Sequence, residues 1–210
     1  MLQSEVDAAR GAGVTNHPND LRAAAADYGL RLAEVLARQD WSGVERLADE
    51  LRDAWSSGRN VFLCGNGGSA ANAIHLANDF VHPLWKARRS GMRVSALAAN
   101  AATLTGIAND EGFAEVFAMQ LAAQARAGDV LIVLSGSGNS SNVIRAIEQA
   151  KTMSIRTYAI VGYSGGRAKA MADVAIHVAV DDMQIAEDMQ LIVGHVIMQW
   201  LRRNPPGTEE

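Results

Sequence analysis

The sequence predicts an α/β protein: a three-layer sandwich in which helices cover both faces of a five-stranded parallel sheet, preceded by N-terminal helices. Short continuous apolar runs, typical of strands buried on both faces, alternate with longer segments of helical periodicity. Two of these apolar runs end in loops rich in glycine and serine. The chain has 210 residues, of which 49% are hydrophobic, and this is enough for one sizeable core.

The first part of the chain is expected to be an arm followed by two helices. Residues 1–17 show no clear periodicity, and we predict a flexible arm there. Pro18-Asn19-Asp20 provides a capping start for a first helix, and a second helix is predicted from about Trp41 to Ser57. These N-terminal helices, residues 18–58, have apolar faces, so we expect them to pack on the following domain or on another subunit.

Residues 59–203 carry the alternation of strands and helices, and residues 204–210 form a tail. Strands are predicted at 61–64, 94–98, 130–134, 157–161 and 174–180. Helices are predicted at about 70–81, 101–108, 113–125, 141–153, 168–171 and 184–202. Parallel strands joined by right-handed crossovers place helices on both faces of the sheet, and ligands then bind beyond the carboxyl ends of the strands.

The composition argues against several classes of function. The formal net charge is −4 and no basic run is present, so we expect no nucleic-acid partner. No apolar stretch approaches the roughly 20 residues of a membrane span, and Met1–Asn19 lacks the apolar segment of a signal peptide. The single cysteine, Cys64, cannot build a disulfide framework. We therefore expect a soluble, cytoplasmic protein without a membrane partner.

The loop Gly65-Asn66-Gly67-Gly68-Ser69 joins the first strand to a helix. Glycines let the backbone approach a ligand closely, and the following helix start offers free N–H groups and a positive dipole end. A phosphate fits such a place, although the loop is neither a Walker A loop nor a dinucleotide-binding fingerprint. Taken alone, it is equally consistent with a tight turn closed by a serine cap.

The second loop, Ser135-Gly136-Ser137-Gly138-Asn139-Ser140, follows the clearest strand of the chain. It offers three hydroxyls and an amide within six residues, next to a helix start. Hydroxyls and backbone N–H groups together satisfy all the oxygens of a phosphate without a lysine or arginine. This loop therefore predicts a phosphate site.

Histidine and carboxylate side chains recur on two of the predicted helices. His75 and Asp79 are four positions apart and share a helix face, where they could bind zinc, orient a base, or form a polar pair between helices. Glu187 and His195 are eight positions apart, about 12 Å along the last helix, so we expect them to flank an extended substrate rather than share one ion. In so apolar a helix, His195 is also compatible with a structural role.

Together these motifs resemble the sugar isomerase (SIS) family, whose fold is flavodoxin-like, and within it the phosphoheptose isomerase branch. The resemblance covers about residues 35–203. It rests on the first loop, on His75 and His195, on the segment Ala108-Asn109-Asp110-Glu111-Gly112-Phe113, and on residues 135–142.

The resemblance implies an aldose–ketose isomerase that converts sedoheptulose 7-phosphate to D-glycero-D-manno-heptose 7-phosphate through an enediol(ate), with Asp79 as base and His195 as acid. It implies no organic cofactor, a zinc ion in many relatives (one per active site), and a homotetramer with active sites at subunit interfaces. The implied metal ligands are His75, Asp79, Glu187 and His195. The residues implied to hold the phosphorylated sugar are Asn66, Gly67, Gly68, Ser69, Asn109, Asp110, Ser135, Gly136, Ser137, Ser140 and Glu187.

The sequence departs from this family at four places. Asp79 stands where glutamate is usual, Glu187 replaces a glutamine, Gly136 replaces a threonine, and Pro83 lies near the place of an arginine. A shorter base must be offset by the placement of its backbone. Two other functions therefore stay open: a non-catalytic sugar-phosphate-binding protein with a regulatory or assembly role, and an isomerase of another phosphosugar.

Overall fold

A computed structural model describes residues 20–88 and 91–207, with two compact units that meet at Arg38 and Gln39. The described part of the first unit is the helix α2 (Leu21–Arg38). Asp20 caps this helix, because its Oδ1 accepts from the backbone N–H of Arg22 at 2.9 Å. The helix predicted after Pro18-Asn19-Asp20 is thus confirmed, whereas the predicted arm of residues 1–17 lies outside the described residues.

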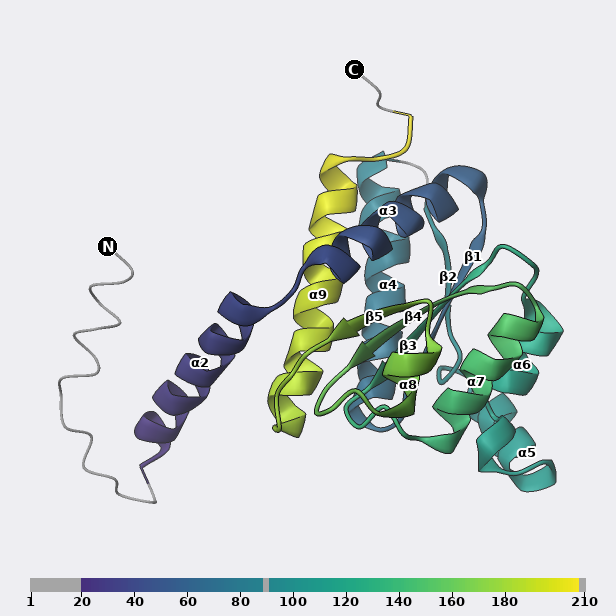
Figure 1. Cartoon of the computed structure of the whole chain (residues 1–210). Coiled ribbons are helices and arrows are strands. Elements are labelled where there is room, and N and C mark those ends of the chain that lie inside the picture. The colour runs from purple at the N-terminus through teal and green to yellow at the C-terminus, as the bar shows by residue number, and fades with distance from the viewer. Residues whose placement is uncertain (1–19, 89–90, 208–210) are drawn as a thin grey trace. The chain divides into compact units, whose positions relative to one another are not determined.

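The second unit contains a five-stranded parallel sheet with helices on both of its faces (Figure 1). The strand order is β2-β1-β3-β4-β5, so the direction of winding reverses between the two central strands β1 and β3. Ligands bind at such a switch point in open α/β sheets. The predicted fold class is confirmed, with strands β1 (Asn60–Cys64), β2 (Arg93–Ala96), β3 (Val130–Ser135), β4 (Arg156–Val161) and β5 (Val174–His177).

The side chains of the central strands alternate between two buried cores. Val130, Ile132 and Leu134 of β3 face one core, and Leu131 and Val133 face the other. The first core is closed by α3 (Ser42–Ser57), α4 (Gly68–Arg88) and α9 (Met183–Arg203). The second is closed by α5 (Ala101–Asp110), α6 (Ala118–Gln124), α7 (Ser141–Thr152) and α8 (Gly166–Met171), with Val116 and Phe117 from the segment after η1 (Phe113–Glu115).

Three segments differ most from their predicted bounds. α4 continues to Arg88 instead of ending near residue 81. It passes through Pro83 because the next residue, Leu84, is fully buried, and the packing of this face outweighs the local cost of a proline. The helix predicted over 113–125 forms two pieces, η1 and α6, and β5 ends at His177 rather than at residue 180.

None of the described helices is both long enough and apolar enough to span a membrane.

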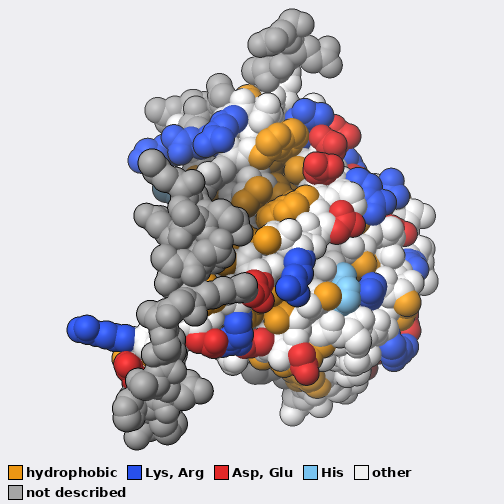
Figure 2. Space-filling model, turned by 60° about the vertical axis from the view of Figure 1, so that its left-hand side comes forward, with side chains coloured by type: hydrophobic (Ala, Val, Ile, Leu, Met, Phe, Trp, Pro, Cys, Tyr) orange, Lys and Arg blue, Asp and Glu red, His pale blue; other side chains and the backbone are white. Residues whose placement is uncertain are grey.

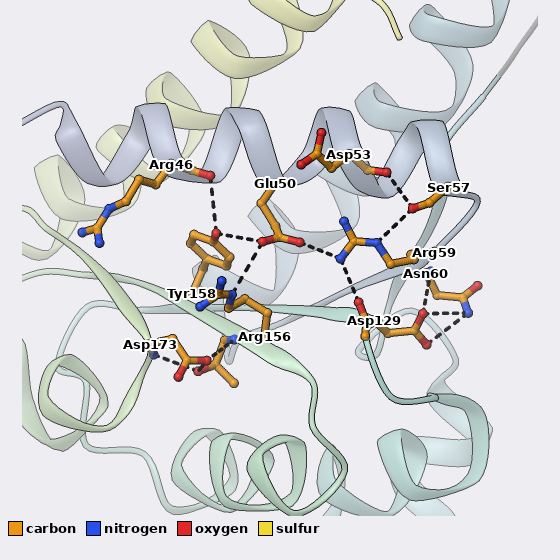
Figure 3. A network of polar contacts seen from close by, with 12 residues as sticks. Arg46, Glu50, Asp53, Ser57, Arg59, Asn60, Asp129, Arg156, Tyr158 and Asp173 are labelled. Atoms are coloured by element: carbon orange, nitrogen blue, oxygen red, sulfur yellow. Dashed lines mark hydrogen bonds and ion pairs between the residues drawn. The ribbon is translucent and has the colours of Figure 1, made fainter. Parts of the chain in front are cut away.

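A polar network lies at the amino ends of the strands (Figure 3). Glu50 of α3 is at its centre: its carboxylate pairs with Arg59 at 2.6 Å and with Arg156 at 3.6 Å, and it accepts from the hydroxyl of Tyr158 at 3.4 Å. Asp129, just before β3, accepts from the first backbone N–H of β1 at 2.8 Å. These contacts tie α3 to the sheet at the edge opposite the two glycine- and serine-rich loops.

The tyrosine of this network makes the fold sensitive to alkaline pH. Burial, with a further contribution from Glu50, raises the pKa of Tyr158 from 10.0 to about 12. The unfolded chain therefore releases this proton first as the pH rises, and stability falls. We expect the free energy of unfolding to drop by about 2 kcal/mol between pH 10 and pH 12 through this group.

Urea unfolding of wild type and Tyr158→Phe over this pH range tests the prediction. The stability of wild type relative to Tyr158→Phe should be constant below pH 10 and decline above it. A difference that does not change up to pH 12 would contradict the proposed cause.

Candidate functional site

The loop after β3 carries the predicted phosphate-binding serines. Ser135 is buried, and its Oγ accepts from the backbone N–H of Gly138 at 3.0 Å. Ser137 is exposed, and its Oγ accepts a longer bond from Asn139 N–H at 3.3 Å. Ser140 is the N-cap of α7, but its hydroxyl makes no capping hydrogen bond. Two hydroxyls thus accompany the N–H groups of the first turn of α7, where the helix dipole favours an anion.

The loop between β4 and α8 packs against the serine loop. Gly138 has a φ of 66°, and a Cβ atom added to it would overlap the carbonyl oxygen of Gly165. The Gly138 carbonyl accepts from Ala168 N–H at 2.9 Å, and Asn139 Oδ1 accepts from Arg167 N–H at 3.0 Å. The shape of the serine loop therefore depends on glycine at position 138.

Met183, the first residue of α9, packs on the serine loop at Gly136. A Cβ atom added to Gly136 would overlap the Met183 sulfur. The glycine that replaces a family threonine is therefore matched by a large side chain from another element. No hydroxyl could be added at position 136 unless Met183 moved.

The loop after β1 is linked to the serine loop by a pair of side-chain amides. Asn66 Nδ2 donates to Asn142 Oδ1 at 2.8 Å, and Asn142 Nδ2 donates back to Asn66 Oδ1 at 2.9 Å. Gly67 and Gly68 are exposed beside this pair, and Gly67 has a φ of 54°. The amide pair thus joins the two loops at the switch point between β1 and β3.

A buried chain of hydrogen bonds fixes the first loop to α9. Gln190 Nε2 donates to the hydroxyl of Ser69 at 3.0 Å, and Asn72 Nδ2 donates to Gln190 Oε1 at 3.0 Å and to the Glu187 carbonyl at 3.0 Å. Ser69, Asn72 and Gln190 are all buried. The Ser69 side chain is therefore engaged inside the protein, and in the structure it anchors the loop.

Sequence reasoning missed Asn72, Gln190 and Asn142 as residues of this region. A usable signal was present for the first two, since both occupy the apolar face of their helices. Asn72 lies four positions before the buried Leu76, and Gln190 lies three before the buried Val193. A polar side chain at such a position has to find a buried partner.

His75, Asp79 and His195 come together between α4 and α9. The two Nε2 atoms of the histidines are 2.9 Å apart, and Asp79 Oδ2 lies 3.5 Å from His75 Nε2 and 3.3 Å from His195 Nε2. The imidazoles meet edge to face, so one Nε2 donates a hydrogen bond that the other accepts. The side chain of Asp79 is only 14% exposed, compared with 50% for His75 and 39% for His195.

Among the described residues, these three form a group that could hold a metal ion. Ligand bonds of about 2.0–2.1 Å in a tetrahedral zinc site put ligand atoms roughly 3.3 Å apart, and the distances in this group are close to that value. The donor set of two imidazoles and a carboxylate also suits zinc. The convergence of His75 with His195 could not be foreseen from spacing, because 120 positions separate them.

Glu187 lies elsewhere on α9, with its carboxylate against Gly68 at the start of α4. A Cβ atom on Gly68 would overlap that carboxylate. Glu187 is not part of the His75–Asp79–His195 group. Gly68 thus gives the carboxylate room to approach the glycine loop.

Asn109 and Asp110 end α5 and are exposed. Asn109 Nδ2 donates to Asp110 Oδ1 at 2.7 Å. In residues 20–88 and 91–207, no hydrogen bond joins these two side chains to either loop or to the histidines.

The helices α4 and α9 run side by side in the same direction from the edge that carries the loops (Figure 1). At about 1.5 Å per residue, His75 is roughly 10 Å along α4 from Gly68, and His195 is roughly 12 Å along α9 from Glu187. The candidate site is therefore an elongated strip. The two glycine- and serine-rich loops lie at one end and the two imidazoles with Asp79 at the other.

The close approach of these helices depends on Gly194, which precedes His195. A Cβ atom at this position would overlap the side chain of Leu76, which is itself buried. We expect Gly194→Ala to push α9 from α4, to separate the two histidines and to cost about 1–3 kcal/mol of stability by overpacking.

Thermal unfolding of Gly194→Ala, together with an assay of the activity proposed below, checks this prediction. Gly106→Ala is a matched control, since Gly106 lies in the helix α5 with open space around its Cα. That control should gain about 0.5–1 kcal/mol from helix propensity. A Gly194→Ala protein as stable and as active as the control would refute the packing argument.

Comparisons with known proteins agree with this fold. Residues 26–162 match the family model of the SIS domain. A phosphoheptose isomerase of Akkermansia muciniphila is 38% identical over 164 residues, which cover 78% of this chain and 86% of that protein. One from Chlorobaculum tepidum is 38% identical over 178 residues, covering 84% and 85%.

A solved structure extends the similarity to three dimensions. The phosphoheptose isomerase of Neisseria gonorrhoeae superposes with a TM-score of 0.80 at 28% identity, covering 88% of this chain and 100% of that one. The matched family model spans more than half of the chain and includes both glycine- and serine-rich loops. This chain therefore belongs to the SIS domain family.

Proposed function

We propose that this protein is a phosphoheptose isomerase, which interconverts sedoheptulose 7-phosphate and D-glycero-D-manno-heptose 7-phosphate. The observation that carries the proposal is the contact between Asp79 and His195, which lie at the end of the site opposite the serine loop. A carboxylate and an imidazole in contact supply the base and the acid of an aldose–ketose isomerisation. The activity named for relatives at 38% identity supports the same assignment.

The phosphate of the substrate binds at the serine loop. The hydroxyls of Ser137 and Ser140 and the N–H groups at the start of α7 donate to its oxygens, while Ser135 and Gly136 shape the loop. The open-chain sugar then lies along the strip. A length of roughly 10 Å suits a long phosphosugar, whose carbonyl end must reach the imidazoles.

The middle of the sugar lies over the first loop, where it contacts Asn66, Gly67 and Gly68. The Glu187 carboxylate accepts from sugar hydroxyls beside Gly68. Asn109 and Asp110 of a neighbouring subunit line the site across the subunit interface. Ser69 holds the loop after β1 in place through its hydrogen bond with Gln190.

The reaction is a proton transfer between neighbouring carbons. Asp79 removes the proton from the carbon next to the carbonyl group and produces an enediol(ate). His195 moves a proton between the two oxygens, and the proton held by Asp79 returns to the adjacent carbon. Ketose and aldose are thereby interconverted with no net change in protons.

We propose one zinc ion per site, held by His75, Asp79 and His195. Glu187, which the family resemblance implies as a further ligand, lies against Gly68 instead, and we assign its carboxylate to the sugar. The ion, when bound, polarises the substrate carbonyl and stabilises the enediolate oxygen. Metal analysis of purified protein should find one zinc per chain, and His75→Ala should lose it. A protein that binds no zinc at micromolar concentration would remove the metal from the proposal.

We also propose a homotetramer with active sites at its subunit interfaces. His75 and His195 lie among exposed apolar side chains, with Ile74, Val81 and Trp85 on α4 and Val196 on α9. Figure 2 shows hydrophobic side chains gathered on one face between charged ones. A groove of about 400 Å³ between α3 and α9 is also largely apolar; its lining includes Trp41, Val44, Ala48, Val196, Ile197 and Trp200. Such patches are typical of surfaces that other subunits cover.

Sedimentation of Trp85→Glu tests the assembly. This substitution should break the tetramer, whereas Met119→Glu, at an exposed methionine on α6, should leave it intact. A wild-type monomer at micromolar concentration would contradict the proposed interface.

We expect the protein to work in the cytoplasm. Its single cysteine, Cys64, is free and buried at the end of β1, and free thiols are usual in reducing compartments.

Incubation of the purified protein with sedoheptulose 7-phosphate, with detection of the aldose product, tests the activity. Ser135→Ala/Ser137→Ala should raise KM at least tenfold, because the Ser137 hydroxyl bond to a charged group is worth about 1.5–3 kcal/mol and the Ser135 hydroxyl holds the shape of the loop. Ser141→Ala, at the exposed neighbouring serine, is the matched control. Failure to turn over this substrate, with or without zinc, would overturn the proposed function.

A further inference from the structure

Pro83 lies inside α4, four residues after Asp79 and eight after His75. The helix continues to Arg88 beyond it. A proline has no N–H, so the carbonyl of Asp79 has no partner at the i+4 position. The pyrrolidine ring also crowds that same carbonyl. The disturbed turn of the helix is therefore the one that carries the Asp79 carboxylate.

The surrounding packing limits the sides on which this turn could open. Leu76, Phe80 and Leu84 are each at most 2% exposed and hold the inner face of α4 on both sides of the proline. Asp79 and Pro83 lie on a neighbouring stripe of the helix, in line with His75. The inner face is held by packing, and the hydrogen bond that Pro83 cannot donate lies on the stripe that bears Asp79, so an opening of the turn is expected along that stripe.

The position of the carboxylate agrees with such an opening. Aspartate has a short side chain, yet a single oxygen of Asp79 lies within 3.5 Å of imidazoles from two helices. Its other oxygen accepts from Asn78 Nδ2 at 3.3 Å. A displacement of this helix turn toward α9 would bring the short side chain of Asp79 within contact of His195.

We propose that Pro83 is a positioning residue for Asp79: by opening the turn between residues 79 and 83, it holds the carboxylate against His75 and His195. The inference rests on the proposed function only where activity is the readout. Replacement by alanine restores the missing hydrogen bond, closes the turn and withdraws the carboxylate.

Kinetics of Pro83→Ala test this role. We expect its kcat to fall at least tenfold with KM changed less than threefold, because the phosphate loop is untouched, and its thermal stability to equal or exceed that of wild type. Asp79→Glu should reverse the loss at least fivefold in the Pro83→Ala protein, since the longer side chain recovers the reach. In the native Pro83 protein the same substitution should lower kcat.

Pro206→Ala, at a proline beyond α9, is the control and should leave kcat unchanged. A Pro83→Ala enzyme within twofold of wild-type kcat would overturn the inference. So would an Asp79→Glu effect of the same size and sign in both backgrounds.

A spectroscopic measurement separates this inference from the proposed function. In metal-free protein at fixed pH, the ¹⁵N shifts of the His75 and His195 rings report the nearby carboxylate, and Asp79→Asn supplies the reference for its loss. Pro83→Ala should move these shifts toward the reference. Unchanged ring shifts would refute the positioning role, whether or not the protein turns over any sugar.

Discussion

Gly138→Ala is expected to abolish the binding of phosphorylated ligands and to cost at least about 3 kcal/mol of stability. Two effects combine at this position. The φ of 66° costs an L-residue about 1–2 kcal/mol, and the new Cβ would overlap the backbone of Gly165. The overlapping atoms of Gly165 belong to the backbone and cannot adopt another rotamer as a side chain can, so the serine loop must shift.

Gly128→Ala separates the two effects. Gly128 also has a positive φ, of 89°, but the nearest atom to its added Cβ is Arg59 Cδ at 3.8 Å. It should therefore lose only about 1–2 kcal/mol and keep its affinity for inorganic phosphate. Calorimetric titration with phosphate and urea unfolding of both variants give the comparison. A Gly138→Ala protein that binds phosphate within threefold of wild type would show that the serine loop is not the anion site.

His195→Gln is expected to lower kcat by about 10²–10⁴-fold while leaving the fold and the phosphate site intact. The glutamine amide keeps a polar group of similar length but cannot exchange a proton with a substrate oxygen. The His195 side chain is 39% exposed, so its replacement leaves no buried cavity. The KM for the phosphosugar should change little, because the serine loop lies at the other end of the strip.

His82→Gln provides the control on the same surface, since His82 is an exposed histidine of α4 outside the group of three. Its kcat should stay within twofold of wild type. Activity of His195→Gln within tenfold of wild type would remove this histidine from the proton transfer. Binding of the phosphosugar without turnover in the wild-type protein would instead favour the non-catalytic sugar-phosphate-binding alternative.

Contacts between distant elements explain why the effect predicted for Gly138→Ala is large. The serine loop rests on the loop before α8, the glycine loop is tied to α9 through Gln190, and Gly194 sets the approach of α9 to α4. Each contact joins elements far apart in the chain. A small change at a glycine therefore alters the relative position of groups that must act on one ligand.

The sequence by itself determined the fold class, and it predicted where a ligand would bind. Continuous apolar runs such as 130–134 marked the strands, because a strand buried on both faces has no polar positions to alternate. Glycines and serines directly after two of these strands marked the end of the sheet where we propose that phosphate binds. The four-residue spacing of His75 and Asp79 put both on one helix face.

Only the tertiary structure decided which side chains meet. It brought His195 to His75 and Asp79, turned Glu187 toward Gly68, buried the hydroxyl of Ser69 against Gln190, and carried α4 through Pro83. The physical reason is the range of the interactions. Periodicity reports how each segment is buried, whereas the register between two helices is set by non-local packing, as at Leu76 and Gly194.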